Sequence, residues 1–265
     1  MLDVILVVYV SLLGLIVGSA INAIVWRLHE GKSWVHGRSQ CPKCGHTLAA
    51  GDLIPVLSWV WLRGRCRYCK KPISVQYPLV ELLSALVFGL SVSALPLSTP
   101  LQQWAFALWL LILTLLLLLA VYDLKWMLLP DKIVIPLGIV GALFVLSAIV
   151  PASGWGTASG FLLGALVSGG FFYAIAAFSR GRAMGGGDIK LAFVMGLFLS
   201  PARLFVAMEI AFVTASVIGV GMLAAGRIER RGHLPFGPYL VLGAIVSFLY
   251  GDYIINLYLK ISGLN

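Results

Sequence analysis

Charged residues are scarce in this sequence. Of its 265 residues, 11% are Asp, Glu, Lys or Arg and 60% are hydrophobic, and the mean hydropathy is +1.00. Globular domains contain about 25% charged residues. The apolar runs also approach the ~20 residues that a helix needs to cross a bilayer. A single buried soluble core is therefore excluded, and the composition predicts an all-α integral membrane protein that uses the lipid bilayer as its main solvent.

Acidic residues are fewer still, at 10 against 19 Lys and Arg, which gives a formal net charge of +9. A basic protein can bind nucleic acid, but the sequence has no stripe of alternating basic and aromatic residues, so we expect no nucleic-acid partner. In a membrane protein, Lys and Arg first indicate topology. The first apolar run lacks a basic segment before it and a small-residue cleavage site after it, so we expect a retained helix.

Apolar runs of near-spanning length predict about eight transmembrane helices, and the run at 189–199 is the shortest. A helix that begins in the glycines before it would bring it closer to spanning length. The sequence thus predicts a first transmembrane helix in 1–27, a polar loop domain in 28–78 and a seven-helix membrane core in 79–265. The eight runs are residues 5–25, 79–97, 104–122, 133–150, 159–178, 189–199, 204–225 and 239–257.

Basic residues test this arrangement, because connections after odd-numbered spans share one side of the membrane. Of the 19 Lys and Arg residues, 17 fall in those connections, and only Arg203 and Lys260 fall opposite. The positive-inside rule then predicts that the loop faces the cytoplasm and that both termini lie outside.

All four cysteines lie in the polar loop, as the pairs Cys41/Cys44 and Cys66/Cys69 with 21 residues between the pairs. Two C-x-x-C turns at such a spacing are typical of a closed, structural zinc site with four thiolate ligands. Two disulfides are the alternative, which a reducing cytoplasm disfavours. We therefore predict that the loop folds around Zn²⁺, since about 50 residues with few large apolar side chains build little core.

Two aspartates stand at the predicted cytoplasmic ends of spans. Asp123 ends the third span, and Asp188 follows three glycines and begins the sixth. Acids at membrane depth are costly, and they usually face partners or cavities. A close pair would share a proton, so that one member activates water while the other protonates a departing amine, as peptide hydrolysis requires. Gly185 and Gly187 would let a substrate strand approach; a phosphate-binding role lacks the required βαβ context.

Three further charged residues compete with or support this pair. Asp131 follows Pro130, where an ordinary helix N-cap is the alternative to a supporting role. Lys190 offsets the charge of Asp188 or reaches lipid headgroups. Glu81 begins the second span, where the alternatives are a favourable helix-dipole interaction and a part in methyl transfer.

The order of these motifs resembles the bacterial type IV prepilin peptidase family over nearly the whole chain. The resemblance rests on the two cysteine pairs, on residues 77–81 and 129–131 with Asp123, on the GGGDIK segment at 185–190 and on the PFGP segment at 235–238. The G-x-G-D tetrapeptide alone is a weak signal; its spacing with the cysteine pairs makes it specific.

The resemblance implies a bifunctional aspartic peptidase of the bacterial inner membrane that serves type IV pili or type II secretion. Its catalytic pair falls on Asp123 and Asp188; prepilins or pseudopilins are the substrates, and S-adenosylmethionine is the methyl donor. Gly64 and Glu81 are carried over as methyltransferase residues, although no glycine-rich segment for S-adenosylmethionine is visible. The alternatives are a single-function aspartic intramembrane peptidase and a non-enzymatic zinc-dependent scaffold or transporter.

Overall fold

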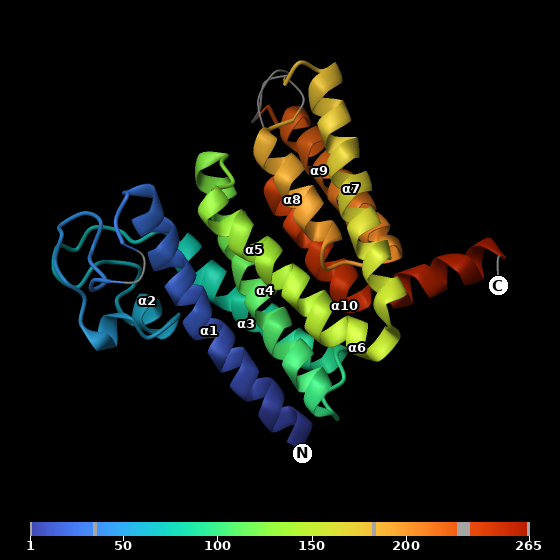
Figure 1. Ribbon diagram of the computed structural model, residues 1–265. Helices are drawn as coiled ribbons and strands as arrows, with labels where there is room; N and C mark the ends of the chain where they lie inside the picture. The colour runs from blue at the N-terminus through green and yellow to red at the C-terminus, as the bar shows by residue number, and fades with distance from the viewer. Residues whose placement is uncertain (1, 34–35, 182–183, 227–233, 264–265) are drawn as a thin grey trace. The chain divides into compact units, whose positions relative to one another are not determined.

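The computed structural model describes residues 2–33, 36–181, 184–226 and 234–263, and in these ranges the regular secondary structure is helical, with two isolated β-bridges in addition. The predicted all-α class is confirmed (Figure 1). The elements are α1 (Leu2–His29), η1 (Ala50–Asp52), α2 (Leu57–Trp61), α3 (Gln76–Ala94), α4 (Pro100–Trp126), α5 (Asp131–Phe144), the π-helical η2 (Val145–Ile149), α6 (Val150–Ser153), α7 (Trp155–Phe178), α8 (Gly186–Gly196), α9 (Pro201–Ala224) and α10 (Gly237–Ser262).

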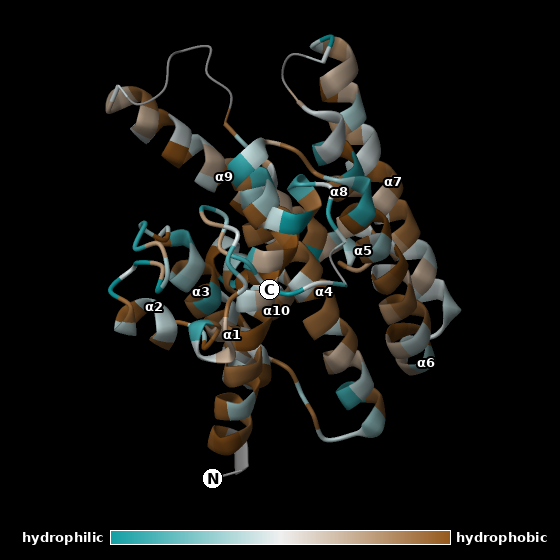
Figure 2. Cartoon of the chain, turned by 90° about the vertical axis from the view of Figure 1, so that its left-hand side faces the viewer, coloured by the Kyte–Doolittle hydropathy of each residue, from teal (hydrophilic) through white to brown (hydrophobic). Residues whose placement is uncertain are grey.

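Seven helices of the described chain are long and apolar enough to cross a membrane, with α5 to α6 forming one continuous span. Their outward faces carry many exposed Leu, Ile, Val and Phe side chains, and Figure 2 shows the helices as mostly hydrophobic. Such surfaces suit lipid, which offers no hydrogen bonds to the backbone. The chain is a multi-pass membrane protein.

The helix α8 corresponds to the short predicted span, and it does begin inside the glycines, although it has only 11 residues. It runs antiparallel to α7: a Cβ on Gly169 would lie 3.0 Å from Phe193, and one on Gly160 would lie 3.8 Å from Pro201. The residues after α8 therefore continue along α7 to the level of Gly160. Together, α8 and the residues that follow it run back along most of the length of α7. As a result, α9 begins near the start of α7, and the two helices are roughly parallel.

Two compact units make up the chain, Met1–Pro96 and Leu97–Asn265. In the first unit α1 packs on α3 through small residues: a Cβ on Gly18 would lie 2.7 Å from the Cα of Glu81, and one on Gly14 would lie 2.8 Å from the Cα of Ala85. Small residues are what close helix packing in membranes requires. The predicted division into 1–27, 28–78 and 79–265 stays a prediction.

The second unit has an aromatic core. Trp109 of α4 stacks on Phe248 of α10 with ring centroids 3.6 Å apart, and both side chains are buried. Near the opposite end of α10 from Gly237, Arg203 of α9 forms an ion pair with Asp252. Four of the arginines used in the topology count lie outside the described residues: Arg182, Arg227, Arg230 and Arg231.

Candidate active site and metal centre

Asp123 lies near the end of α4, in its last turn, and its side chain is buried, with 5% of the residue exposed. The helix ends at Trp126, and its C-cap Met127 takes a left-handed conformation (φ 52°) and turns the chain toward α5. The backbone N–H of Gly237 donates a hydrogen bond of 3.0 Å to Asp123 Oδ2. A buried carboxylate thus meets the N-terminus of α10, where orphan N–H groups and the helix dipole stabilise negative charge.

Gly237 is a close-contact position. A Cβ there would lie 2.6 Å from Asp123 Oδ2 and 3.3 Å from Leu129 Cδ2, so any other residue forces the carboxylate or the helix to move. The preceding ring, Phe236, lies 5.3 Å from Phe212 and 6.1 Å from Phe172 between centroids, which anchors the start of α10 against α9 and α7. In the sequence, this PFGP segment contributes only to the family resemblance. The sequence did not identify Gly237 as the partner of Asp123.

Asp188 is half-buried in the first turn of α8. Gly185 is the N-cap of α8, and the backbone N–H of Asp188 donates to the carbonyl of Gly185 at 3.2 Å. Gly187 is again a close-contact position, because a Cβ there would lie 2.8 Å from the Cβ of Leu129. The glycines therefore let the α8 N-terminus approach the segment that follows α4.

Leu129 brings the two aspartates together, because its side chain lies between Gly187, beside Asp188, and Gly237, the donor to Asp123. The carboxylates of Asp123 and Asp188 lie near enough for their charges to interact. The end of α4 and the starts of α5, α8 and α10 thus gather at one end of this unit, as Figure 1 shows. Leu129 has an ordinary apolar side chain, so the sequence did not predict that it lies between Gly187 and Gly237.

Asp131 and Lys190 form an ion pair, with Lys190 Nζ at 2.7 Å from Asp131 Oδ1 and 2.9 Å from Oδ2. Both side chains are about half exposed, at 55% and 54%. Pro130 is the N-cap of α5 and Asp131 the first helical residue, so the N-cap expectation is wrong by one position, although the carboxylate still lies in the first turn. The pair joins α5 to α8 beside Asp188, and Lys190 does not turn to Asp188.

The four cysteines form one cluster whose Sγ atoms all lie within 4.8 Å of one another. A tetrahedral site with Zn–S bonds of 2.3 Å needs sulfurs about 3.8 Å apart, and Cys41 and Cys69 stand at 4.0 Å. All four are free thiols, so the alternative of two disulfides is wrong in this structure. The donor set therefore fits a four-thiolate metal centre.

The two cysteine pairs lie on equivalent turns. In each, the residue after the second cysteine is left-handed (Gly45, φ 72°; Lys70, φ 58°) and its N–H donates to the carbonyl of the first cysteine. Burial acts to raise the pKa of the Cys41 thiol, but the N–H groups of Lys43 and Cys44 outweigh it and lower that pKa to about 7. Such turns present N–H groups to a thiolate and so prepare it for a cation.

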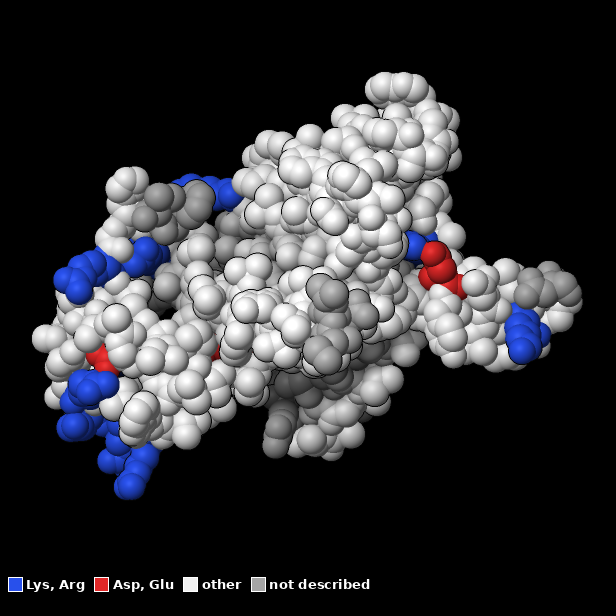
Figure 3. Space-filling view, turned by 90° about the horizontal axis from the view of Figure 1, so that it is seen from below, with Lys and Arg blue, Asp and Glu red and all other residues white. Residues whose placement is uncertain are grey.

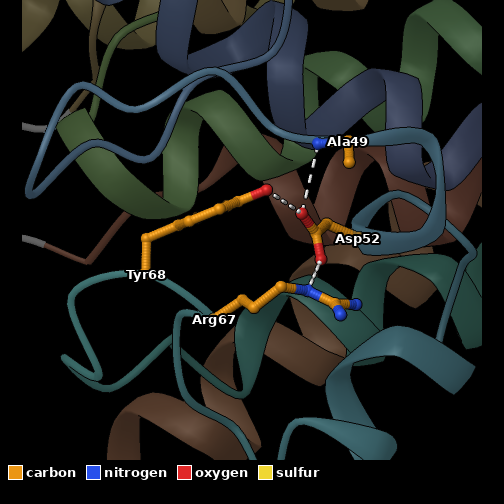
Figure 4. A network of polar contacts seen from close by, with 4 residues as sticks. All are labelled: Ala49, Asp52, Arg67 and Tyr68. Carbon is orange, nitrogen blue, oxygen red and sulfur yellow. Dashed lines mark hydrogen bonds and ion pairs between the residues drawn. The ribbon is translucent and has the colours of Figure 1, made fainter.

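A polar network fastens the second turn to the rest of the loop (Figure 4). Asp52 Oδ1 accepts from Arg67 Nε at 2.6 Å, and Oδ2 accepts from the Ala49 N–H at 3.1 Å and the Tyr68 hydroxyl at 3.3 Å. Partial burial acts to raise the pKa of Asp52, but the bond from Arg67 and the N–H of Ala49 hold it below its ordinary value of 3.8. The network links η1 with the cysteine turn at 66–69.

Gly64 and Glu81 lie in the first unit. Gly64 is left-handed (φ 67°), and a Cβ there would lie 3.0 Å from the ring of Trp59. Glu81 is the sixth residue of α3, beyond its first turn, so the dipole interpretation is wrong; its Oε2 accepts from the N–H of Val56 at 2.7 Å instead. Val56 has a positive φ of 61° at this contact, which is a strained value for a β-branched residue.

The fold and these sites define a class: a helical membrane protein with two neighbouring aspartates in one unit and, in the other, a cluster of four thiols that could hold a metal. Comparison with known families agrees. Residues 12–95 match the bacterial peptidase A24 N-terminal domain, and residues 109–220 match the type IV leader peptidase family. No solved structure matches the chain.

Relatives match over most of their length. The prepilin leader peptidase/N-methyltransferase of Aeromonas salmonicida (strain A449) is 37% identical over 224 residues, covering 84% of this chain and 75% of the relative. The protein of the same name from Bacillus subtilis (strain 168) is 34% identical over 254 residues, covering 94% and 96%. The chain belongs to the bacterial type IV prepilin leader peptidase family, and the resemblance inferred from its motifs is confirmed.

Proposed function

We propose that this protein is a bifunctional membrane enzyme that removes the leader peptide from type IV prepilins or pseudopilins and then methylates the new N-terminal amine. Membership in a family whose relatives are named prepilin leader peptidase/N-methyltransferase supports both activities. The observation that carries the peptidase assignment is the pairing of Asp123 and Asp188 at one end of the second unit. Gly185, Gly187, Lys190 and Asp131 support that pair.

The chemistry follows from two carboxyl groups that repel each other. Two such groups do not both ionise easily, so the pair holds one proton between them. The ionised member removes a proton from water, which attacks the scissile carbonyl; the protonated member donates its proton to the departing amine, and the C–N bond breaks. No metal is needed for this hydrolysis. The N–H group of Gly237 holds the carboxylate of Asp123 in place meanwhile.

The membrane orientation is part of the proposal. We assign the protein to the bacterial inner membrane with the cysteine loop and the aspartate end cytoplasmic and both termini outside, because 17 of 19 Lys and Arg residues fall on that side of the predicted topology. The same rule holds the basic leader of a prepilin in the cytoplasm, so the leader and the two aspartates meet on one side.

For the second activity we propose Zn²⁺ on Cys41, Cys44, Cys66 and Cys69, and S-adenosylmethionine as the source of the methyl group. The four-thiol cluster supports a metal, which would serve a structural purpose by fixing the two turns. Gly64 adjoins the second turn, and Glu81 is tied by hydrogen bond to the segment between the turns. Both therefore stay candidates for the methyltransferase site.

The test is mass spectrometry of a prepilin co-expressed with the full-length enzyme, which reports cleavage and the added methyl together. Asp123→Asn and Asp188→Asn should each abolish cleavage while the protein stays inserted in the membrane. Asp131→Asn, another acid at the same end of the unit, is the matched control and should cleave. Full activity in either of the first two variants would refute the aspartate pair. Cleavage without any methylated product would favour the single-function peptidase.

A further inference from the structure

The short helix α2 turns large apolar side chains outward. Trp61 is 84% exposed, Leu57 62% and Val60 59%, whereas Trp59 turns inward, donating from Nε1 to the carbonyl of Ile73 and packing against Gly64. Among the described residues, the segment thus has one tryptophan that packs inward and three apolar side chains that are exposed. Exposed side chains of this kind on a five-residue helix need a partner that is itself apolar.

The position of α2 along the membrane normal is fixed by a hydrogen bond to a spanning helix. Val56, the N-cap of α2, donates to Glu81 in α3, and Glu81 lies five residues after Gln76, the first residue of the span. At 1.5 Å per residue this is about 7.5 Å inside the end of the span. The start of α2 therefore lies at the depth where headgroups meet acyl chains, which is where Trp and other amphipathic groups accumulate.

Cationic side chains follow α2 directly. Leu62, Cys66 and Arg67 line a cavity together with three cations: Arg63, Arg65 and Lys70. Arg67 is engaged by Asp52, but among the described residues no acid pairs with Arg63, Arg65 or Lys70. Figure 3 shows Lys and Arg side chains gathered on the loop, at the left of the view.

The metal centre does not account for this charge. The polar loop, residues 28–78, contains eight Lys and Arg residues against two acids. Four thiolates with one Zn²⁺ would carry two negative charges, so the loop stays strongly positive even with its metal bound. Arg63, Arg65 and Lys70 are therefore available to an anion from outside the chain.

We propose that α2 and the cavity of Arg63, Arg65 and Lys70 form a binding site for an anionic phospholipid. The side chains of Leu57, Val60 and Trp61 enter the acyl boundary of the leaflet, and the three cations bind the headgroup phosphate. Clustered Lys and Arg beside a spanning helix are the usual basis of such recognition. The loop is thereby docked on the bilayer at a second place, apart from its connections to α1 and α3. This site is independent of the peptidase proposal.

Native mass spectrometry of the full-length protein, titrated with phosphatidylglycerol or phosphatidylcholine, tests the site. The wild type should retain phosphatidylglycerol in preference to phosphatidylcholine. At about 1 kcal/mol per cation near the surface, the triple variant Arg63→Gln, Arg65→Gln, Lys70→Gln should bind phosphatidylglycerol about 100-fold more weakly. The control Lys32→Gln, Arg38→Gln, Lys43→Gln removes the same charge from the first half of the loop and should keep the preference.

Zinc content, measured on every variant, separates lipid binding from folding. Equal retention of the two lipids, or equal losses in both triple variants, would overturn the site, as would loss of zinc from the cavity variant alone, because the cations would then serve the metal. Displacement of the lipid by glycerophosphate would overturn the role of α2. In brominated phosphatidylglycerol, wild-type tryptophan emission should be quenched more than that of Trp61→Phe; equal quenching contradicts insertion of α2.

Discussion

The backbone N–H of Gly237 donates to Oδ2 of Asp123 over 3.0 Å, although 114 positions separate the two residues in the chain. The donor is the first residue of α10 and the acceptor is in the last turn of α4. The hydrogen bond therefore makes the orientation of a buried carboxylate depend on where a second, sequence-distant helix of the unit begins. Gly237 is a positioning residue for Asp123, and it can be tested without touching either aspartate.

Gly237→Ala should leave the protein inserted but nearly inactive as a peptidase. The new Cβ would stand 2.6 Å from Asp123 Oδ2, so the carboxylate must move, and misplacement of a reacting group by about 1 Å costs about 100-fold in rate. The loss should fall on kcat more than on KM in cleavage assays with purified prepilin. Gly170→Ala on α7, where no atom lies within 4 Å of the added Cβ, is the matched control and should cleave normally. A fully active Gly237→Ala would contradict the positioning role.

The Asp131–Lys190 pair should matter far less than Asp123. Because both side chains are about half exposed, the pair is worth about 1 kcal/mol or less, and Asp131→Asn or Lys190→Met should slow cleavage about fivefold at most. The exchange Asp131→Lys with Lys190→Asp should recover part of that loss, since the ion pair forms again between α5 and α8. A complete loss of cleavage in Asp131→Asn, without recovery in the exchange, would instead make Asp131 part of the chemistry.

Glu81→Gln should abolish methyl transfer while prepilin cleavage continues, as read by mass spectrometry of the pilin. Glutamine retains an oxygen to accept from Val56 N–H but lacks the charge, so this variant separates a chemical role of Glu81 from its structural hydrogen bond. Glu81→Ala removes both. Methylation that survives in Glu81→Gln and fails in Glu81→Ala would reduce Glu81 to a tether. Ser84→Ala, which loses only a bond to the Val80 carbonyl in the same helix, serves as control.

Asp52→Asn should weaken the loop by about 1 kcal/mol, because Arg67 loses its ionised partner. The pKa of Asp52 lies below its ordinary 3.8, so its stabilising contribution is complete above that value and disappears only as the pH falls through the lowered pKa. Between pH 6 and 8 the difference between wild type and variant should therefore stay constant in hydrogen exchange of residues 49–69. A difference that varies across this range would point to the thiols instead, whose metal affinity depends on pH.

Much of this protein was predictable from residue type and local spacing. The four cysteines came together as their two C-x-x-C turns indicated, and every apolar run formed a helix. Both signals are local: a turn of four residues brings two sulfurs together, and about 20 apolar residues leave a helix as the only stable form in lipid. The order of the motifs around Asp123 and Asp188 indicated the protein family.

Contacts between distant residues were not predictable. Nothing in the composition of residues 235–238 says that Gly237 donates to Asp123, or that Leu129 fills the space between two glycines. Likewise Glu81 at the start of a span suggested a helix-dipole effect, whereas its partner is Val56 in a loop 25 positions away. Such pairings depend on how helices meet, which periodicity and spacing do not encode.

The packing of Gly14 and Gly18 of α1 against α3 also decides how the loop assembles. Because α1 ends at His29 and α3 begins at Gln76, the two paired helices hold both ends of the loop near one another before any metal binds. The conformational entropy of closing the loop between α1 and α3 is then lost when these helices associate in the bilayer. A metal ion would have only the two short cysteine turns left to bring together. We therefore expect a metal to bind the four thiols more tightly once α3 has inserted beside α1.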